Sequence, residues 1–227
     1  MPELTPSEVV ERLSRLYGRP RLMPSGDPLA ELVLTILSQN TSDRNSGRAF
    51  VRLLRRYRSW REVAEADLGG LVETIREGGL ANQKAPRIQA ALRAALARSP
   101  DGDLGFLRDL PLEEARAWLR SLPGVGPKTA ACVLLFSLGR PAMPVDTHVE
   151  RVAKRLGLIP NSASAEQAHE LLEAWVPPEL VYPFHMCLVK HGRRTCTARN
   201  PACDRCPLVS SCPFGAARLG LTPAATS

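Results

Sequence analysis

Hydrophobic side chains recur every three or four residues along most of the chain, which is the spacing of one face of an α-helix. Near the start, Thr5-Pro6-Ser7-Glu8 has the residues of a capping box with proline in the first turn, and an apolar stripe from Val9 to Leu16 follows it. Residues 29–37 are apolar on most faces and end in a polar turn over residues 38–43. The pattern predicts an amphipathic first helix and a buried second helix.

Four further helices are predicted between residue 50 and the helix that begins at Pro111. A basic amphipathic segment covers residues 50–57, a second runs from Asp67 to Gly78-Gly79, a third covers residues 84–97, and Pro111 begins the fourth. The sequence has no alternating strand-type run, no internal repeat of solenoid length and no low-complexity stretch. We therefore predict an all-α fold with short loops.

The composition is that of a folded, basic protein. With 227 residues, 44% of them hydrophobic, the chain can bury a core, which excludes a disordered tail protein. Its 30 Lys and Arg residues outnumber 23 Asp and Glu residues, and the net charge of +7 favours a polyanionic partner. No apolar run approaches the roughly 20 residues of a membrane span, and the first residues lack the layout of a signal peptide. We expect an intracellular protein, cytoplasmic or at the nucleoid, with no membrane partner.

A glycine-rich turn at residues 122–130 separates two predicted helices. Gly124 and Gly126 allow positive φ and a close backbone approach around Val125, and Pro127 suits the first turn of the next helix. The N–H groups of such a turn, with a helix dipole behind them, form an anion site that fits a DNA phosphate. The segment is either a phosphate-binding hairpin or an ordinary turn between helices.

Two ionisable residues follow this turn. Lys128 lies in the first turn of the next predicted helix, where the dipole disfavours a cation, and imine chemistry requires an amine that has lost its proton. Asp146 comes later, at the start of another helix, as a cap or as a catalytic carboxylate, with Thr147 and Glu150 as an alternative capping box. Taken alone, these residues leave a phosphate-contacting lysine and a nucleophile both open.

The cysteines form two groups. Cys132 and Cys187 stand alone in apolar segments and are predicted to be small buried hydrophobic residues. The other four crowd together among prolines as Cys196-x6-Cys203-x2-Cys206-x5-Cys212. Because a secreted disulfide framework would spread its bridges over the chain, we interpret this group as a metal site. Four thiolates suit zinc or a [4Fe–4S] cluster, and the spacing by itself leaves both open.

Three motifs together resemble one known family. LPGVGPKTA at residues 122–130, VDTHVERV at residues 145–152 and the four-cysteine loop occur in the order and spacing of the endonuclease III family of base-excision DNA glycosylases. That family belongs to the helix-hairpin-helix superfamily with a Gly/Pro-rich loop and an essential Asp. The resemblance runs from about Leu29 to Cys212, which is most of the chain.

The resemblance implies a bifunctional enzyme of base-excision repair that acts on damaged double-stranded DNA. Lys128 falls on the family's Schiff-base nucleophile and Asp146 on its essential carboxylate. Such an enzyme removes oxidised pyrimidines from duplex DNA and nicks the strand by β-elimination, an AP lyase activity. The cysteine spacing resembles the family's cluster loop, which implies a [4Fe–4S] cluster with all four cysteines as its ligands.

Two loops in the amino-terminal half resemble family elements that fill the gap left by a flipped base. In the turn at residues 38–43 the family's gap-filling Gln aligns best with Asn40, while Gln39 comes one residue early. In the second loop, Leu80 matches an apolar wedge, and Ala81 replaces an aromatic residue often found beside it. These departures leave the preferred lesion and the opposite base open.

Further DNA contacts are expected from the hairpin and from basic residues around the cysteines. The expected contacts are Gly124, Val125 and Gly126, then His148, and then Arg193, Arg199 and Arg205, with Lys190 and Arg194 adding positive charge. His148 either organises the Asp146 carboxylate or packs beside it. The remaining histidines, His169, His185 and His191, are expected to be structural or solvated.

By family analogy the chain should fold as two helical lobes. A six-helix barrel with the hairpin is expected over residues 22–139, and a second helical lobe with the cluster loop over residues 1–21 and 140–214. Residues 215–227 would form a carboxy-terminal tail. Lys128 and Asp146 should face each other across a DNA cleft between the lobes, and the protein is expected to be a monomer.

Other functions fit the residues less well. A monofunctional mismatch glycosylase, of the adenine or thymine/uracil type, usually lacks a lysine at position 128, and the adenine type carries a large further domain where only a short segment follows Cys212 here. A non-catalytic helix-hairpin-helix DNA-binding protein needs neither Lys128 nor Asp146. A redox-sensing regulator is disfavoured because no separate recognition helix is found.

Overall fold

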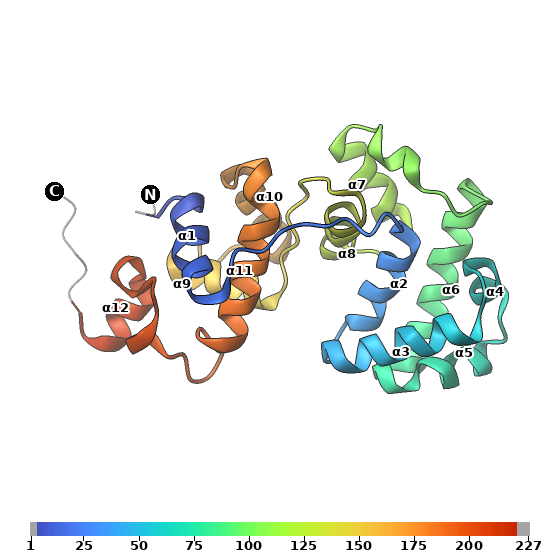
Figure 1. Cartoon of the computed structure of the whole chain (residues 1–227), viewed down its shortest axis with the longest axis horizontal. Helices are drawn as coiled ribbons and strands as arrows, with labels where there is room; N and C mark the ends of the chain where they lie inside the picture. Colours follow the sequence, from blue (N-terminus) through green and yellow to red (C-terminus); the bar gives the residue numbers. More distant parts are fainter. Residues whose placement is uncertain (1–3, 222–227) are drawn as a thin grey trace. The chain divides into compact units, whose positions relative to one another are not determined.

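Helices make up the regular structure of the chain. The computed structural model describes residues 4–221, and no strand occurs within that range (Figure 1). The predicted all-α fold class is confirmed. Across the same residues, none of the helices combines the length and the apolar character that crossing a membrane requires.

The α-helices are α1 (Pro6–Tyr17), α2 (Pro28–Ser38), α3 (Asp43–Arg56), α4 (Trp60–Glu65), α5 (Leu68–Ile75), α6 (Ala81–Arg98), α7 (Leu112–Ser121), α8 (Pro127–Cys132), α9 (Thr147–Leu156), α10 (Ala165–Trp175), α11 (Val181–Arg194) and α12 (Pro213–Leu219). The shorter helical turns are η1 (Arg76–Gly78), η2 (Gly105–Arg108), η3 (Val133–Ser137), η4 (Pro178–Leu180), η5 (Cys203–Arg205) and η6 (Val209–Ser211). All of them are 3₁₀ except η3, which is a π-helical turn.

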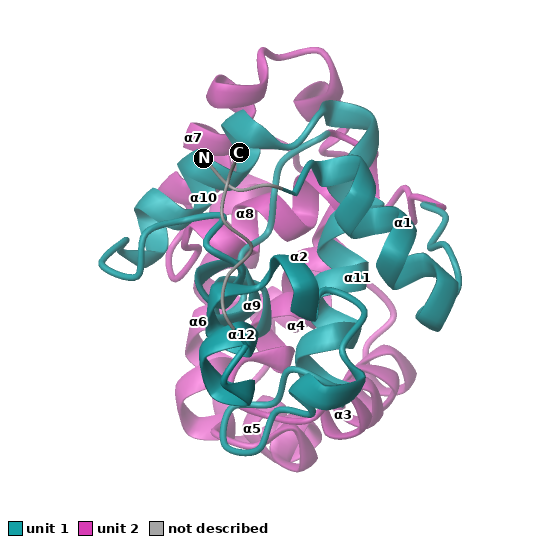
Figure 2. Ribbon diagram, turned by 90° about the vertical axis from the view of Figure 1, so that its left-hand side faces the viewer, with its two compact units in different colours: residues 1–22, 141–227 teal, residues 23–140 magenta. Residues whose placement is uncertain are grey.

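The chain divides into two compact units (Figure 2). Unit 2 is residues 23–140, and unit 1 joins the chain up to residue 22 with the chain from residue 141 onward. The barrel expected from the sequence, residues 22–139, begins and ends one residue before unit 2 does. Of the expected tail, residues 215–219 belong to α12, and residues 222–227 lie outside the described residues.

Unit 2 is built around α2, which is buried on most sides as its apolar sequence predicts. Asp27 caps the helix by accepting a hydrogen bond from the Ala30 N–H at 2.9 Å, and Pro28 takes the first helical position. The helix packs against α3, α6, α8 and η3. The loop after α2 and the helix after the glycine hairpin are therefore both attached to the core of this unit.

Unit 1 combines the first helix of the chain with the late ones. Both α1 and α9 pack against α11, and α12 packs against α9; Figure 1 shows α1, in blue, beside α11, in orange. The predicted capping box of α1 is confirmed, because Thr5 Oγ1 accepts from the Glu8 N–H at 3.2 Å and Glu8 Oε2 accepts from the Thr5 N–H at 2.8 Å. The box fixes where the helix begins.

Two helices differ from the sequence-based expectation. The basic helix expected over residues 50–57 begins at Asp43, because Ser42 accepts a hydrogen bond from the Asn45 N–H and starts the helix there. The short helix α4 is absent from the predicted set, since its six residues are too few to show a helical period. Ser59 caps it in the same way.

Candidate active site and metal centre

The glycine hairpin of unit 2 is formed as the sequence indicates. Gly124 has φ 77°, a left-handed conformation that suits glycine, and the Val125 N–H donates to the Leu122 carbonyl at 3.1 Å. Val125 is buried, whereas Gly124 and Gly126 are exposed. Buried Val125 therefore anchors the turn, and its two glycines face solvent.

Lys128 is the second residue of α8 and is half-buried. Sequence reasoning missed a carboxyl near it, Glu31 of α2, although an acid inside an otherwise apolar segment is a visible signal. Burial raises the pKa of Glu31, while a hydrogen bond from Thr35 Oγ1 at 3.1 Å and the charge of Lys128 lower that pKa to a smaller extent. Unit 2 therefore places a partly buried carboxyl within electrostatic reach of Lys128.

Asp146 is the N-cap of α9 in unit 1. Its Oδ1 accepts hydrogen bonds from the His148 N–H at 2.9 Å and the Val149 N–H at 2.8 Å. The alternative capping box with Thr147 and Glu150 is wrong, because Asp146 holds the cap position and Glu150 pairs with Lys154 Nζ at 2.7 Å instead. Both cap bonds use one carboxylate oxygen, so capping and a chemical role are compatible.

Buried histidines pin the segment that leads into Asp146, a second feature that the sequence does not reveal. His169 Nδ1 lies 2.8 Å from the Met143 carbonyl, and His185 Nδ1 lies 2.8 Å from the Pro144 carbonyl. Both rings are buried, which confirms a structural role. Glu173 accepts the Met143 N–H at 2.7 Å. Three side chains of α10 and α11 thus fix the backbone just before the cap.

His148 connects the start of α9 with the start of the cysteine loop. Its Nδ1 lies 3.0 Å from Arg151 Nη2, and the same guanidinium donates to the Gly192 carbonyl at 2.9 Å and, through Nε, to the Cys196 carbonyl at 3.1 Å. The ring is half-buried. The His148 ring therefore contacts the Arg151 guanidinium, while its backbone N–H is the group that binds the Asp146 carboxylate.

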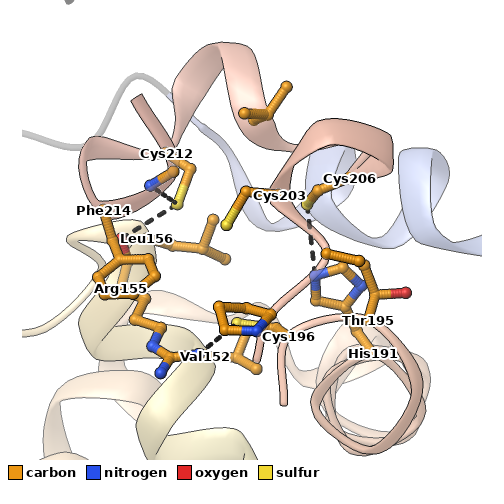
Figure 3. Close-up of a pocket in the computed structure, with 14 residues that line it drawn as sticks. Val152, Arg155, Leu156, His191, Thr195, Cys196, Cys203, Cys206, Cys212 and Phe214 are labelled. Atoms are coloured by element: carbon orange, nitrogen blue, oxygen red, sulfur yellow. Dashed lines mark hydrogen bonds between the residues drawn. The ribbon is translucent and has the colours of Figure 1, made fainter. Parts of the chain in front are cut away.

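The four clustered cysteines border one pocket of unit 1 (Figure 3). Three of their sulfurs lie near N–H groups: Arg155 Nη1 is 3.3 Å from Cys196 Sγ, His191 Nε2 is 3.5 Å from Cys206 Sγ, and the Gly215 N–H is 3.3 Å from Cys212 Sγ. Burial, with smaller contributions from the neighbouring cysteines, raises the pKa of the Cys206 thiol to about 11. Thiolate ligands therefore need compensating positive charge here, which N–H donors and a bound metal both supply.

A hydrogen bond at Nδ1 orients the His191 ring so that its Nε2 faces Cys206 Sγ. Burial lowers the pKa of His191 to about 4, so the ring is neutral at physiological pH. Its Nδ1 lies 3.1 Å from the Tyr17 hydroxyl, which also lies 2.7 Å from Thr195 Oγ1. A neutral ring that accepts from Tyr17 at Nδ1 carries its proton at Nε2 and donates it toward Cys206. The expected structural role of His191 is thus a specific one.

The side chains fit an iron–sulfur cluster. Four cysteines line one pocket, N–H groups lie beside three of their sulfurs, and thiolates are the ligands that such a cluster takes. The residues that would hold the cluster are Cys196, Cys203, Cys206 and Cys212.

Several of the expected DNA-contact residues occupy exposed or strained positions. Asn40 is exposed and has φ 52°, while Gln39 is half-buried. Leu80 has φ 53° and is 46% exposed, so it combines a left-handed backbone with an apolar side chain in water. Arg193, Arg199 and Arg205 are exposed.

The expected site residues are divided between the units. The hairpin, Lys128, Asn40 and Leu80 belong to unit 2, while Asp146 and the cysteines belong to unit 1. That Lys128 and Asp146 meet stays a prediction. The lone cysteines Cys132 and Cys187 are buried, as predicted.

Comparisons with known proteins identify relatives for both parts. Residues 33–178 match the family described as HhH-GPD superfamily base excision DNA repair protein, and residues 196–212, which hold the four cysteines, match the iron-sulfur binding domain of endonuclease III. The endonuclease III of Thermotoga maritima is 37% identical over 212 residues, which are 91% of this chain and 93% of that protein. The DNA glycosylase/AP lyase ROS1 of Arabidopsis thaliana is 33% identical over 71% of this chain and 13% of its own length. A solved trapped endonuclease III–DNA covalent intermediate is 31% identical, with a TM-score of 0.81 over 95% of this chain and 99% of that one.

Proposed function

The chain belongs to the HhH-GPD superfamily of base excision DNA repair proteins, and we propose that it removes oxidised pyrimidines from duplex DNA and cleaves the strand at the abasic site left behind. It is a base-excision repair DNA glycosylase with AP lyase activity, and it carries a [4Fe–4S] cluster. We propose three things beyond this: the class of lesion, the residues that react and the residues that contact DNA.

The position of Lys128 carries the proposal. It stands at the start of α8, directly after an exposed glycine hairpin and within reach of the Glu31 carboxyl. Its amine attacks C1′ of a nucleotide that has left the base stack, so that an N–C1′ bond forms while the C1′–base bond breaks and the base leaves with a proton. The sugar ring opens to an imine, and loss of a C2′ proton expels the phosphate at C3′, which breaks the strand.

Asp146 stabilises the positive charge that develops on the sugar as the base departs. The two N–H groups that bind its Oδ1 fix the orientation of the carboxylate. The histidines that pin the preceding segment hold the backbone from which it projects. Lys128 and Asp146 act on the same sugar.

Three sets of residues grip the DNA. The hairpin around Val125 presents the backbone of exposed Gly124 and Gly126 to a phosphate, which positions the duplex without reading its sequence, while the Val125 N–H stays bonded to the Leu122 carbonyl. Asn40, or Gln39 beside it, and Leu80 enter the space that the flipped nucleotide leaves. His148, Arg193, Arg199 and Arg205, with Lys190 and Arg194 nearby, add contacts from unit 1.

The cysteines contribute structure rather than chemistry. When bound, the cluster would link four side chains of a segment whose regular structure is two short 3₁₀ turns. This link holds Arg199 and Arg205 in fixed places on the loop. We infer that the protein acts as a monomer and works where genomic DNA lies, in the cytoplasm at the nucleoid.

Borohydride trapping tests the function directly. The protein is incubated with a duplex that carries one thymine glycol, and the imine is reduced to a stable protein–DNA adduct. We expect an adduct with the parent protein and none with Lys128→Gln, which keeps the length and polarity of the side chain but has no nucleophilic amine. The visible absorbance of the cluster is recorded for both proteins as a folding control.

Two results would reject this function. An adduct that persists in Lys128→Gln would move the nucleophile elsewhere in the chain. Alkali-labile sites without any adduct would mean that base removal proceeds through water, as in a monofunctional mismatch glycosylase. An adenine-mismatch duplex run in parallel separates the two lesion classes.

A further inference from the structure

The proposed reaction makes no use of a second, more deeply buried lysine, Lys84 of α6. This side chain is 1% exposed, and its Nζ donates hydrogen bonds to the Leu37 carbonyl at 2.6 Å and to the Gly78 carbonyl at 2.8 Å. Leu37 is the next-to-last residue of α2, and Gly78 ends η1. One ammonium group therefore joins two segments that are separated in the chain by the whole of α3, α4 and α5.

Burying an ammonium group is costly unless other groups replace the water around it. Burial lowers the pKa of Lys84, which is the expected sign of this cost. Its two acceptors are carbonyls at the carboxyl ends of helical segments, where the helix dipole is negative and stabilises a cation. The ends of α2 and η1 thus take the place of a carboxylate partner.

Both segments lead directly into the loops proposed to enter the DNA. The loop at residues 39–42 follows α2 and contains Asn40, and the loop at residues 79–80 follows η1 and contains Leu80. The loops are neighbours, because a Cβ placed on Gly79 would lie 3.8 Å from Thr41 Oγ1. Among the described residues, Asn40 and Leu80 are the non-glycine residues with positive φ. A strained residue therefore follows each of the carbonyls that Lys84 binds.

We propose that Lys84 is a positioning residue that fixes these two loops as one body, so that Asn40 and Leu80 enter the duplex together. The inference rests on the proposed function for the use of the loops, while the coupling of the loops belongs to the free protein. Lys84 touches neither the substrate nor the reacting atoms. It acts through the loops, on the opening of the duplex rather than on the bond-breaking steps.

The same helix offers a matched control in Gln89. This side chain is 4% exposed, and its Nε2 donates to the Val63 carbonyl at 3.2 Å and the Ala66 carbonyl at 2.7 Å. Gln89 thus holds the end of α4 as Lys84 holds the ends of α2 and η1. Lys84→Met and Gln89→Met each remove a buried donor to two carbonyls, but only the first lies beside the DNA loops.

Hydrogen exchange of the free holoprotein tests the coupling without DNA. In Lys84→Met we expect faster amide exchange in the loop at residues 39–42 and in the loop at residues 79–80 at the same time. In Gln89→Met the increase should appear around α4 and leave both loops unchanged. Faster exchange in one loop alone, or in neither, would overturn the coupling. Lys84→Gln, which retains one donor group, serves in the same way if the methionine variant does not fold.

Activity on two substrates tests what the coupling does. A duplex with 2-aminopurine opposite thymine glycol reports insertion, and a single-stranded oligonucleotide with an abasic site reports the lysine chemistry with no duplex to open. We expect Lys84→Met to slow the fluorescence change and base removal by about 10-fold or more, with borohydride trapping on the single strand unchanged within about 2-fold. Gln89→Met should leave the ratio of the two rates at the parent value.

The outcomes separate the two ideas. Equal losses on both substrates, or the same losses in Gln89→Met, would reduce Lys84 to an ordinary core residue. If the parent protein forms no adduct on the thymine glycol duplex but the exchange pattern holds, the proposed lesion class fails while the coupling of the loops stands.

Discussion

The cysteine loop of unit 1 and the paired loops of unit 2 are both irregular, yet they are held in different ways. Residues 196–212 have only the short turns η5 and η6, and their four cysteines line one pocket together with apolar side chains of α9 and α12. The loops at residues 39–42 and 79–80 contain no cysteine or histidine, and a buried ammonium group links the segments that precede these two neighbouring loops. In the first region a cofactor adds to the hydrogen bonds that Arg151 and Arg155 donate, whereas the second depends on the chain's own contacts alone.

The two regions should therefore respond differently to the loss of a single side chain. A region held by a cofactor loses all of its constraints together, because the four ligands act as a unit. A region held by one side chain loses its constraints locally, and the surrounding helices keep their other packing contacts. The size of the response to a single substitution should therefore separate the two kinds of loop.

The largest effect is expected from Cys203→Ala, which removes one cluster ligand. The cluster should be lost, and with it the visible absorbance, the iron bound per chain and the cooperative unfolding of unit 1, because all four thiolates are needed to hold the cluster. Cys187→Ala is the control, since Cys187 is also buried but lies on α11 outside the loop. Stoichiometric zinc with no iron in the purified parent protein would refute the cluster and, with it, this side of the comparison.

Leu80→Gly should have a smaller effect, with opposite signs for stability and activity. Glycine adopts φ 53° without strain, so we expect the free energy of unfolding to rise by up to about 1 kcal/mol. Base removal from a thymine glycol duplex should fall by about 10-fold, because the apolar wedge is gone. The two measurements are chemical denaturation and single-turnover excision. Leu80→Ala keeps the left-handed strain and should lose activity without gaining stability.

Loss of stability in Leu80→Gly would contradict this account, since it would mean that the exposed leucine packs against the unit. Unchanged excision would show that the loop does not enter the duplex. Either result would mean that the paired loops behave as ordinary surface turns. Of the two irregular regions compared, only the cysteine loop would then have a specific function.

The same contrast explains what could be predicted from the sequence. Periodicity and caps predict the helices, because each is a local property, and cysteine spacing predicts the metal loop, because all four ligands lie within the short segment 196–212. The contact of Lys84 with Leu37 joins residues 47 positions apart, and no local pattern reports it. The buried histidines that hold the segment before Asp146 escape prediction for the same reason, since their carbonyl partners are 26 and 41 positions away.

Glu31 lies on α2, the helix that leads into the first of the paired loops. Its effect on stability is expected to be the smallest of these and to depend on pH. Burial raises its pKa above the ordinary value of 4.5, so the unfolded chain loses this proton at a lower pH than the folded protein does. The folded protein therefore binds more protons in that window, and the Glu31 contribution to stability decreases as pH rises through it. Glu31→Gln still accepts the Thr35 hydrogen bond and does not titrate.

We expect the stability of Glu31→Gln relative to the parent to be lowest well below pH 4.5 and to increase toward neutrality. Thermal unfolding at a series of pH values measures the difference, and Glu114→Gln, an exposed change on α7 of the same unit, gives the baseline. Identical pH dependence in the two variants would mean that Glu31 is as well solvated as a surface residue. If the stability of Glu31→Gln relative to the parent grows with pH, the carboxyl beside Lys128 destabilises unit 2 at neutral pH. A helix with a merely structural role would be more stable with an apolar or amide residue there, so a carboxyl at this position indicates a functional role.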